Sequence, residues 1–270
     1  MRITFVGGGN MAGALIGGLI AAGESGGNVA VVEPRAEAAA QLSERYGVSA
    51  FATPSAQAFG GDIVVLAVKP QVMREVARAI AAHVSRQLVV SVAAGIRATD
   101  LSRWLGGHRR IVRAMPNTPA LIGAGVTALA ALPGLAQPDR EAAEAVLAAV
   151  GKTLWVDDEA ALDAVTAVSG SGPAYVFYFM EAIDAAARAL GLNEEQARTL
   201  TLATFEGAAK LALASTDAPG TLRERVTSPN GTTAAALAVL GARNVAGAIV
   251  EAVSAAQRRS VELGDEFGRD

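Results

Sequence analysis

The segment ITFVGGGNMAGALIGGLIAAG, residues 3–23, decides the fold. A short apolar run leads into glycine, glycine and alanine at the spacing Gly-x-Gly-x-x-Ala, and an apolar helical pattern follows. The first glycine permits a tight turn, the second lets the backbone approach a pyrophosphate, and the small third residue lets the helix pack closely on the strand. This strand–turn–helix context predicts a Rossmann-type dinucleotide site. Its expected cofactor contacts are Gly7, Gly9, Asn10 and Met11.

The end of the second strand pattern carries two conflicting signals about the cofactor. Glu33 closes that strand, where a carboxylate commonly binds the ribose 2′-hydroxyl of NAD. Arg35 lies two residues on, where a guanidinium can hold the 2′-phosphate of NADP. The residues alone therefore leave both NADPH and NADH open.

Two further strand ends are expected to face the same crevice. They are LAVKPQ (66–71) and SVAAGI (91–96), with small residues and a proline-constrained turn at the carboxyl ends of strands. The cofactor contacts predicted here are Ala67, Val68, Lys69, Pro70, Ala93, Ala94 and Gly95. A solvated turn lysine at Lys69 and simple tight packing at residues 93–95 are equally open interpretations.

Up to about residue 156, short β-branched runs alternate with amphipathic stretches. The expected strands are 2–7, 29–33, 63–68, 88–92, 110–114, 125–130 and 153–156, and the expected helices are 10–22, 35–46, 71–84, 98–104 and 139–150. The early strands are continuous apolar runs, which are typical of parallel strands covered on both faces. The pattern predicts an α/β fold with a doubly wound sheet.

After Asp157 the strand signals stop. Alanine- and leucine-rich helical patterns cover 158–167, 172–190, 193–214, 219–226, 232–240 and 243–264. We therefore expect a dinucleotide-binding domain over 1–156 and a helical domain over 157–270. Alanine allows helices to approach closely, so we favour an intertwined oligomer over a monomeric bundle.

Composition excludes several classes of function. The 270 residues carry a net charge of −3, which argues against nucleic acid as the main partner. Cysteine is absent, which excludes thiolate chemistry, and with only two histidines we expect no metal site. His83 and His108 are interpreted as surface residues rather than proton donors. No signal-peptide pattern or membrane span is recognisable, so we expect a soluble cytoplasmic protein.

The segment VTSPNGTTAAAL, residues 226–237, predicts a turn that opens a helix. Proline fixes φ, and asparagine and glycine tolerate a positive φ. Thr232 and Thr233 then start the helix, where free backbone N–H groups and the positive end of the dipole favour an anion. Taken alone, the segment also fits an ordinary capped helix.

Together, the motifs FVGGGNMA, AVKPQ, VRAMPNTPA, VTAVSGSGPAY and VTSPNGTTAAAL resemble those of pyrroline-5-carboxylate reductases, in order and over essentially the whole chain. The resemblance implies a Rossmann domain, a helical dimerisation domain, and dimers that often assemble into rings. It also implies NAD(P)H-dependent reduction of the cyclic imine L-1-pyrroline-5-carboxylate to L-proline. Thr233 matches the family's active-site threonine, and Met115, Pro116 and Asn117 resemble its nicotinamide-side loop.

The implied chemistry agrees with the residues. Hydride transfer to a protonated imine needs no nucleophile, metal or thiol, so positioning should supply most of the catalysis. We expect the turn around residues 230–232 to hold the substrate carboxylate and the hydroxyl of Thr233 to contact the ring nitrogen. SGSGPAY (169–175) is a second expected substrate-contact region, in which Ser171 is interpreted as a helix N-cap. The expected substrate contacts are Ser228, Asn230, Gly231, Thr232, Ser171 and Gly172.

Two other readings remain open. One is a Rossmann-type reductase acting on a hydroxy acid or another imine. A hydroxy-acid enzyme usually carries a Lys or His base in a helix at the domain junction, and neither Lys152 nor Lys210 fits that place. The other is a non-catalytic dinucleotide-sensing protein, in which SGSGPAY and VTSPNGTT would be helix caps only.

Overall fold

The computed structural model describes residues 1–269, which form two compact units. One unit holds residues 1–171 together with the chain from residue 256 onward, and the other holds residues 172–255. The strand-rich part ends at Trp155, close to the predicted boundary at residue 156, whereas the compact units divide after Ser171. The predicted division into 1–156 and 157–270 describes functional parts, and it stays a prediction.

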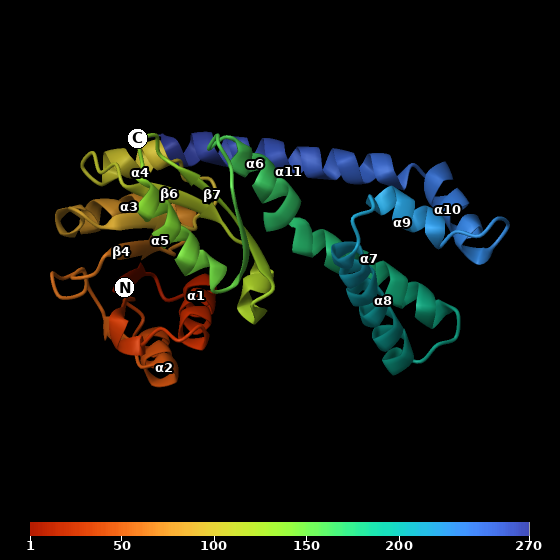
Figure 1. The fold of residues 1–270 in the computed structure, drawn as a ribbon, viewed down its shortest axis with the longest axis horizontal. Coiled ribbons are helices and arrows are strands. Elements are labelled where there is room, and N and C mark those ends of the chain that lie inside the picture. Colours follow the sequence, from red (N-terminus) through yellow and green to blue (C-terminus); the bar gives the residue numbers. More distant parts are fainter. Residues whose placement is uncertain (270) are drawn as a thin grey trace. The chain divides into compact units, whose positions relative to one another are not determined.

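The first unit is built on one eight-stranded sheet (Figure 1). The strands are β1 (Ile3–Val6), β2 (Val29–Val32), β3 (Ser49–Phe51), β4 (Ile63–Leu66), β5 (Leu88–Ser91), β6 (Ile111–Met115), β7 (Gly125–Ala131) and β8 (Gly151–Trp155). Their order in the sheet is β3-β2-β1-β4-β5-β6-β7-β8, and every neighbouring pair is parallel except β6 and β7. The chain order reverses beside β1, so this is the predicted doubly wound arrangement, with a crevice expected where the carboxyl ends of β1 and β4 diverge.

Helices cover both faces of the sheet. They are α1 (Asn10–Ala21), α2 (Ala36–Tyr46), α3 (Pro70–Ile80), α4 (Ala98–Trp104) and α5 (Gln137–Ala148), with 3₁₀ turns at Gly26–Asn28, Ala81–His83 and Thr118–Ile122. One core joins α1, α2 and α5 to the sheet, and a second joins α3, α4 and Phe267 to the other face. The central strands β1 and β4 are buried along their whole length, which explains their continuous apolar sequences.

Two features of the sheet differ from the sequence expectation. β3 was not expected, because a strand of three mostly exposed residues gives no recognisable sequence pattern. β7 runs antiparallel to β6, which a strand pattern alone does not reveal. Only residues 116–124 connect these two strands, and that is shorter than the crossover that a parallel pair requires.

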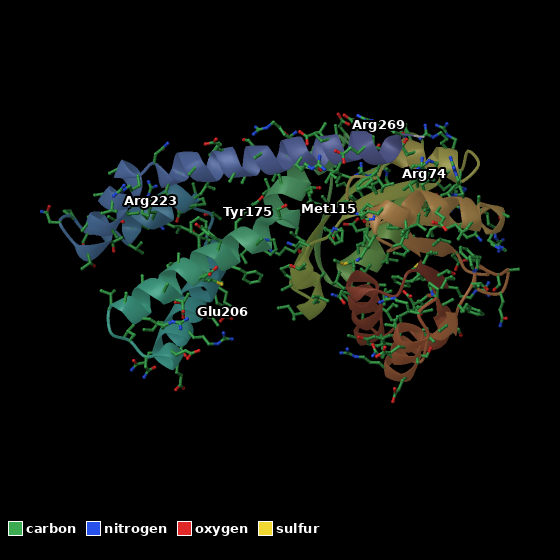
Figure 2. All side chains as sticks on the ribbon, turned by 180° about the vertical axis from the view of Figure 1, so that it is seen from behind. Arg74, Met115, Tyr175, Glu206, Arg223 and Arg269 are labelled. Carbon is green, nitrogen blue, oxygen red and sulfur yellow. The ribbon has the colours of Figure 1, made fainter. Side chains whose placement is uncertain are left out.

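The chain then continues through α6 (Ala161–Val165), a π-helical turn (Thr166–Gly170) and α7 (Gly172–Ala189). The last turns of α11 (Val245–Gly268) return to the first unit and are fixed there by polar contacts. Ser260 donates to Asp163 at 2.6 Å, and Arg97 is paired with Asp265 at 2.5 Å. Arg74 on α3 donates to the carbonyl oxygen of Arg269 at 2.9 Å; both residues are labelled in Figure 2.

The second unit is helical, as predicted. It contains α7, α8 (Glu194–Ala214), α9 (Pro219–Arg225), α10 (Thr232–Ala242) and the first part of α11. α8 begins with a capping box, in which Asn193 and Gln196 satisfy each other's backbone N–H groups. Among residues 1–269, no single helix has the length and apolarity to cross a membrane; α10 and α11 pass that test only as a pair bent by 54°.

Candidate active site

A groove in the first unit follows the carboxyl ends of β1, β2, β4 and β5. It has a volume of about 1060 Å³, which suits a cofactor-sized ligand. Twelve predicted cofactor residues line it: Gly7, Gly9, Asn10, Met11, Glu33, Arg35, Ala67, Val68, Lys69, Pro70, Ala93 and Ala94. The structure therefore brings together residues that lie in four separate stretches of the sequence.

The glycine turn between β1 and α1 has the geometry that a pyrophosphate needs. Gly7 has φ +97°, and a Cβ there would lie 2.9 Å from the carbonyl oxygen of Ala67, so only glycine fits. Gly9 is different, since a Cβ there would meet no atom within 4 Å. The open space at Gly9 lies on the groove, directly before the first N–H groups of α1, whose first turn has no side-chain cap and no acidic residue. A helix N-terminus of this kind can attract an anion.

Both carboxylate oxygens of Glu33 accept hydrogen bonds from protein groups. Its Oε2 accepts from the backbone N–H of Gly8 at 2.8 Å, and its Oε1 accepts from the backbone N–H and Nε of Arg35, both at 2.9 Å. Burial opposes ionisation of this carboxyl, but hydrogen bonds from Arg35 and Gly8 together outweigh it and lower the pKa of Glu33. The carboxylate thus fixes the glycine turn and one edge of the Arg35 guanidinium, whose side chain remains 67% exposed on the groove.

Four other residues predicted at the cofactor do not line this groove. A Cβ on Gly95 would face Phe267 of α11 at 3.2 Å, so the structure gives Gly95 the tight-packing position that was the alternative interpretation. Met115 packs with the small apolar cluster around Leu162, and Pro116 is buried. The Oδ1 of Asn117 accepts from the backbone N–H of Val126 at 3.0 Å, which fixes the start of β7.

Sequence reasoning missed several lining residues. They are Val6, Val32, Pro34, Ala52, Pro54, Val72, Glu75, Val76, Ala79, Ile80 and Val92. Residues 52 and 54 follow β3, so they were missed together with that strand. The residues of α3 had a readable signal, because Pro70 starts that helix directly at the crevice and its first turns must border the cofactor.

The SGSGPAY motif adopts an unusual helical geometry. The backbone N–H of Ser171 donates to the carbonyl oxygen of Thr166, five residues back, at 2.8 Å. Ser171 has helical dihedrals (φ −84°, ψ −20°) rather than the extended conformation of a cap, so the interpretation of Ser171 as an N-cap is wrong. The π-turn joins α6 to α7 without a break in the helical backbone, and α7 begins at Gly172. π-turns are rare and occur frequently at functional sites.

The late turn in the second unit forms as expected. Asn230 has φ +57°, and the backbone N–H of Gly231 donates to the carbonyl oxygen of Ser228 at 3.1 Å. Gly231 is the N-cap of α10, which leaves Thr232 exposed and Thr233 partly buried in the first helical turn. Neither hydroxyl caps the helix. Thr233 therefore does not cap the helix, and the role predicted for its hydroxyl stays a prediction.

The two histidines are not plain surface residues. His83 is partly buried and stacks on Phe59 with ring centroids 5.4 Å apart. Nε2 of His108 lies 2.9 Å from the carbonyl oxygen of Gln87, and burial lowers the pKa of His108. Neither histidine lines the groove.

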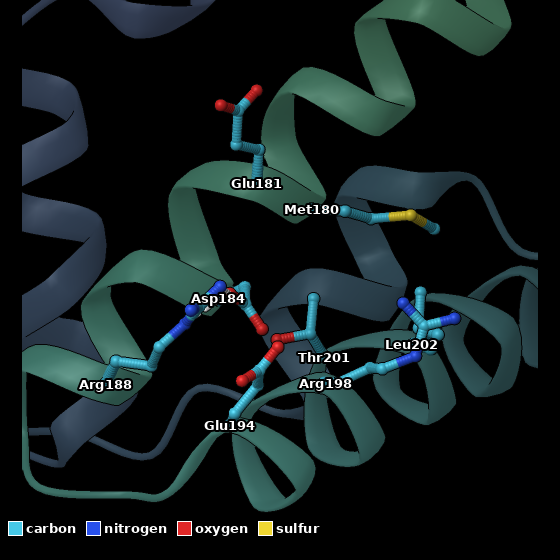
Figure 3. Close-up of a pocket in the computed structure, with 8 residues that line it drawn as sticks. All are labelled: Met180, Glu181, Asp184, Arg188, Glu194, Arg198, Thr201 and Leu202. Atoms are coloured by element: carbon cyan, nitrogen blue, oxygen red, sulfur yellow. Dashed lines mark hydrogen bonds and ion pairs between the residues drawn. The ribbon is translucent and has the colours of Figure 1, made fainter.

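A smaller pocket of about 220 Å³ lies within the second unit, between α7 and α8 (Figure 3). Its lining residues are Met180, Glu181, Asp184, Arg188, Glu194, Arg198, Thr201 and Leu202. Asp184 and Arg188 form an ion pair within α7, and the buried hydroxyl of Thr201 has no hydrogen-bond partner. None of the predicted site residues lines this pocket.

Comparisons with known proteins agree with the motifs. Residues 159–263 match the family model described as pyrroline-5-carboxylate reductase dimerisation, and residues 2–95 match the one described as NADP oxidoreductase coenzyme F420-dependent. The chain is 46% identical to a pyrroline-5-carboxylate reductase of Pseudomonas aeruginosa, covering 99% of this chain and 98% of that protein. It is 41% identical to the enzyme of the same name from Haemophilus influenzae, covering 98% of both chains.

Solved structures give the same result. A pyrroline-5-carboxylate reductase from Coxiella burnetii superposes with a TM-score of 0.90 at 40% identity, covering 97% of this chain and 98% of the other. A Plasmodium falciparum pyrroline carboxylate reductase with NADP bound gives a TM-score of 0.87 at 27% identity, covering 98% of both. Sequence similarity, fold and the order of the motifs thus agree over nearly the full length, and the chain belongs to the pyrroline-5-carboxylate reductase family.

Proposed function

We propose that this protein reduces L-1-pyrroline-5-carboxylate to L-proline with NADPH, with NADH as a second possible cofactor. The observation that carries the proposal is the groove with its open position at Gly9, in a chain similar over 99% of its length to a pyrroline-5-carboxylate reductase. The reaction is the last step of proline biosynthesis. We assign cofactor binding to residues 1–156, and substrate binding and self-association to residues 157–270.

The groove residues fit a dinucleotide. The first N–H groups of α1 and the space beside Gly9 would hold the pyrophosphate, since a helix N-terminus attracts anions. The exposed guanidinium of Arg35 would hold the 2′-phosphate of NADPH. The small residues Ala93 and Ala94 leave the carboxyl end of β5 open along the groove.

The substrate residues are assigned by chemistry. The substrate carries a carboxylate and an imine nitrogen. The binding site therefore needs N–H donors for the carboxylate and a hydroxyl for the imine nitrogen. The turn at Ser228, Asn230 and Gly231, with the N–H of Thr232, would hold the carboxylate, and Thr233 would contact the ring nitrogen. Ser171 and Gly172, at the start of α7, are the second proposed contact region.

Catalysis would depend on protonation and alignment. Bound NADPH would supply the hydride. With the imine nitrogen protonated, its carbon is strongly electrophilic; as a hydride adds there, the C=N electron pair moves to nitrogen and the positive charge disappears. The hydroxyl of Thr233 would hold the N–H in place, while fixed carboxylate contacts keep the ring in a reactive orientation. No side chain of this protein has to form a covalent bond.

Self-association is part of the proposal, and exposed apolar side chains support it. In the helical unit Phe177 is 62% exposed, Tyr178 70% and Leu190 85%, which is more than a helical bundle leaves in water without a partner. A dimer would cover these side chains, and the match to the family's dimerisation model includes them. We also propose a cytoplasmic location, which cell fractionation tests.

The experiment is an NADPH-consumption assay with the purified protein. L-1-pyrroline-5-carboxylate should be reduced, whereas keto acids, the oxidised forms of hydroxy acids, should consume no NADPH. NADPH consumption with a keto acid in place of the pyrroline would favour a different Rossmann-type reductase, one that acts on hydroxy acids. NADPH binding without turnover of any imine would favour a dinucleotide-sensing protein.

A further inference from the structure

The π-turn decides which way Gly170 faces. A π-turn contains one residue more than an α-helical turn, so it rotates the following positions by about 100°. The hydrogen bond from Ser171 to Thr166 closes this wider turn. Thr166 and Ser169 also use their hydroxyls within the helix, donating to the carbonyl oxygens of Leu162 at 2.7 Å and Val165 at 3.1 Å. Side-chain hydrogen bonds thus support the backbone geometry of the turn.

Gly170 faces the side chain of Met115, which is labelled in Figure 2. A Cβ on residue 170 would lie only 2.5 Å from Cε of Met115, well inside van der Waals contact. Gly170 is not among the residues with positive φ, so glycine is required here for space and not for backbone conformation. Because the obstructing atom is the end of a flexible side chain, an added methyl would displace Met115 rather than the backbone.

Met115 stands at the groove end of its strand. In the parallel pair of β5 and β6, Ser91 lies opposite Arg113. Continuing that register by two residues places Met115 level with Ala93, which lines the groove. The side chain of Met115 packs against the cluster that includes Leu162 and Val165, and its Cε faces Gly170 of the π-turn. Met115 is the last residue of β6, so a displaced side chain stays beside the carboxyl ends of the strands.

We propose that Gly170 is a positioning residue that acts through Met115. By leaving room for the methionine methyl group, Gly170 keeps that side chain packed on the π-turn, so that the reactive ring of the cofactor can lie at the carboxyl ends of β5 and β6. This inference rests on the proposed function. It links two motifs, RAMPN and SGSG, that have no hydrogen bond to each other and are more than fifty residues apart in the sequence.

The test is a double-mutant cycle of Gly170→Ala and Met115→Ala, measured by steady-state kinetics and thermal melting. Gly170→Ala should lower kcat about tenfold or more while the KM for NADPH changes less than about twofold. Its Tm should fall by no more than a few degrees, because the gain from alanine as the better helix former offsets part of the packing that Met115 loses. In the Met115→Ala background, the same Gly170→Ala substitution should lower kcat by less than about twofold, because the obstructing methyl group is gone.

Gly13→Ala is the matched control. Residue 13 is also a glycine inside a helix, but its added Cβ would meet only Leu42 at an ordinary 3.8 Å, so activity should stay at the wild-type level. Full activity of Gly170→Ala overturns the proposal, and so does an equal loss of kcat in both Met115 backgrounds. An inactive wild-type protein would instead contradict the proposed function.

A second measurement does not depend on turnover. In protein labelled with ¹³C at the methionine methyl groups, the Met115 signal is assigned by its loss in Met115→Leu. That signal should shift when NADPH is added to the wild-type protein, and it should differ in Gly170→Ala before any addition. A Met115 signal that is unchanged in both experiments, while NADPH demonstrably binds, contradicts the proposal even if Gly170→Ala is too unstable for kinetics.

Discussion

The substitution Thr233→Ala distinguishes two roles of this residue, ligand binding and helix capping, because the two roles predict different effects on stability and on turnover. A capping threonine contributes about 1 kcal/mol to stability. Here Gly231 is the N-cap and α10 has no side-chain cap hydrogen bond, so Thr233 makes no such contribution. Alanine is also the better helix former, by a few tenths of a kcal/mol. The variant should therefore melt at the wild-type temperature or slightly above it.

The kinetic effect should be large. If the hydroxyl of Thr233 contacts the imine nitrogen, its loss removes a hydrogen bond to a group whose charge changes in the transition state. Such a bond is worth about 2–3 kcal/mol, or a factor of about 30 to 150 in kcat. Thr233→Ser keeps the hydroxyl and should retain most of the activity. NADPH affinity should change little in either variant.

The assay is steady-state kinetics with the pyrroline substrate beside a thermal melt. Thr221→Ala is the control, since it removes an exposed threonine hydroxyl from the neighbouring helix α9. Normal turnover by Thr233→Ala would refute the assignment of this residue. A loss of activity that Thr233→Ser shares in full would show that the methyl group matters and the hydroxyl does not.

Three further predictions concern the first unit. Gly9→Val should leave the protein folded, because a Cβ at residue 9 would meet no atom within 4 Å, yet it should abolish NADPH binding in a fluorescence titration; unchanged affinity would remove the cofactor from this loop. Arg35→Ala should raise the KM for NADPH about tenfold or more with little change for NADH, since only NADPH carries the 2′-phosphate; equal effects would place Arg35 in solvent and favour Glu33 as the cofactor-reading residue. The hydrogen bond from Arg110 holds the pKa of Asp139 below its ordinary 3.8, so this pair stabilises the fold above about pH 4 and loses that contribution as the pH falls through the lowered pKa. Asp139→Asn should therefore cost about 1 kcal/mol in urea unfolding at pH 7 and less at pH 3; an equal cost at both pH values would contradict the ionic origin.

The fold was readable wherever the pattern of burial was regular. β1 and β4 are buried on both faces and appear in the sequence as unbroken apolar runs. The glycine turn could also be predicted, because the positive φ of Gly7 favours glycine at that position. β3 was not predicted, because a short, exposed edge strand has no regular pattern of burial. The direction of β7 was encoded in the short connection before it rather than in its own residues.

Residues that line the groove could be predicted from the sequence where they follow strand ends. Long-range packing was not readable. Gly95 follows the correct strand, but its neighbour Phe267 lies at the far end of the chain. Likewise, the sequence placed Ser171 before a helix, but an extra residue in the preceding turn makes the helix continuous. A π-turn has no residue pattern of its own, so its partner Met115 could be found only from the coordinates.

The most direct test of the central claim follows the hydride itself. The purified protein is incubated with L-1-pyrroline-5-carboxylate and NADPH that carries deuterium at the transferable position of the nicotinamide, and the product is analysed by mass spectrometry and NMR. We expect L-proline with one deuterium on the carbon that was the imine carbon, formed only when the protein is present. Proline without deuterium at that carbon, or no proline while the protein binds NADPH, would contradict it.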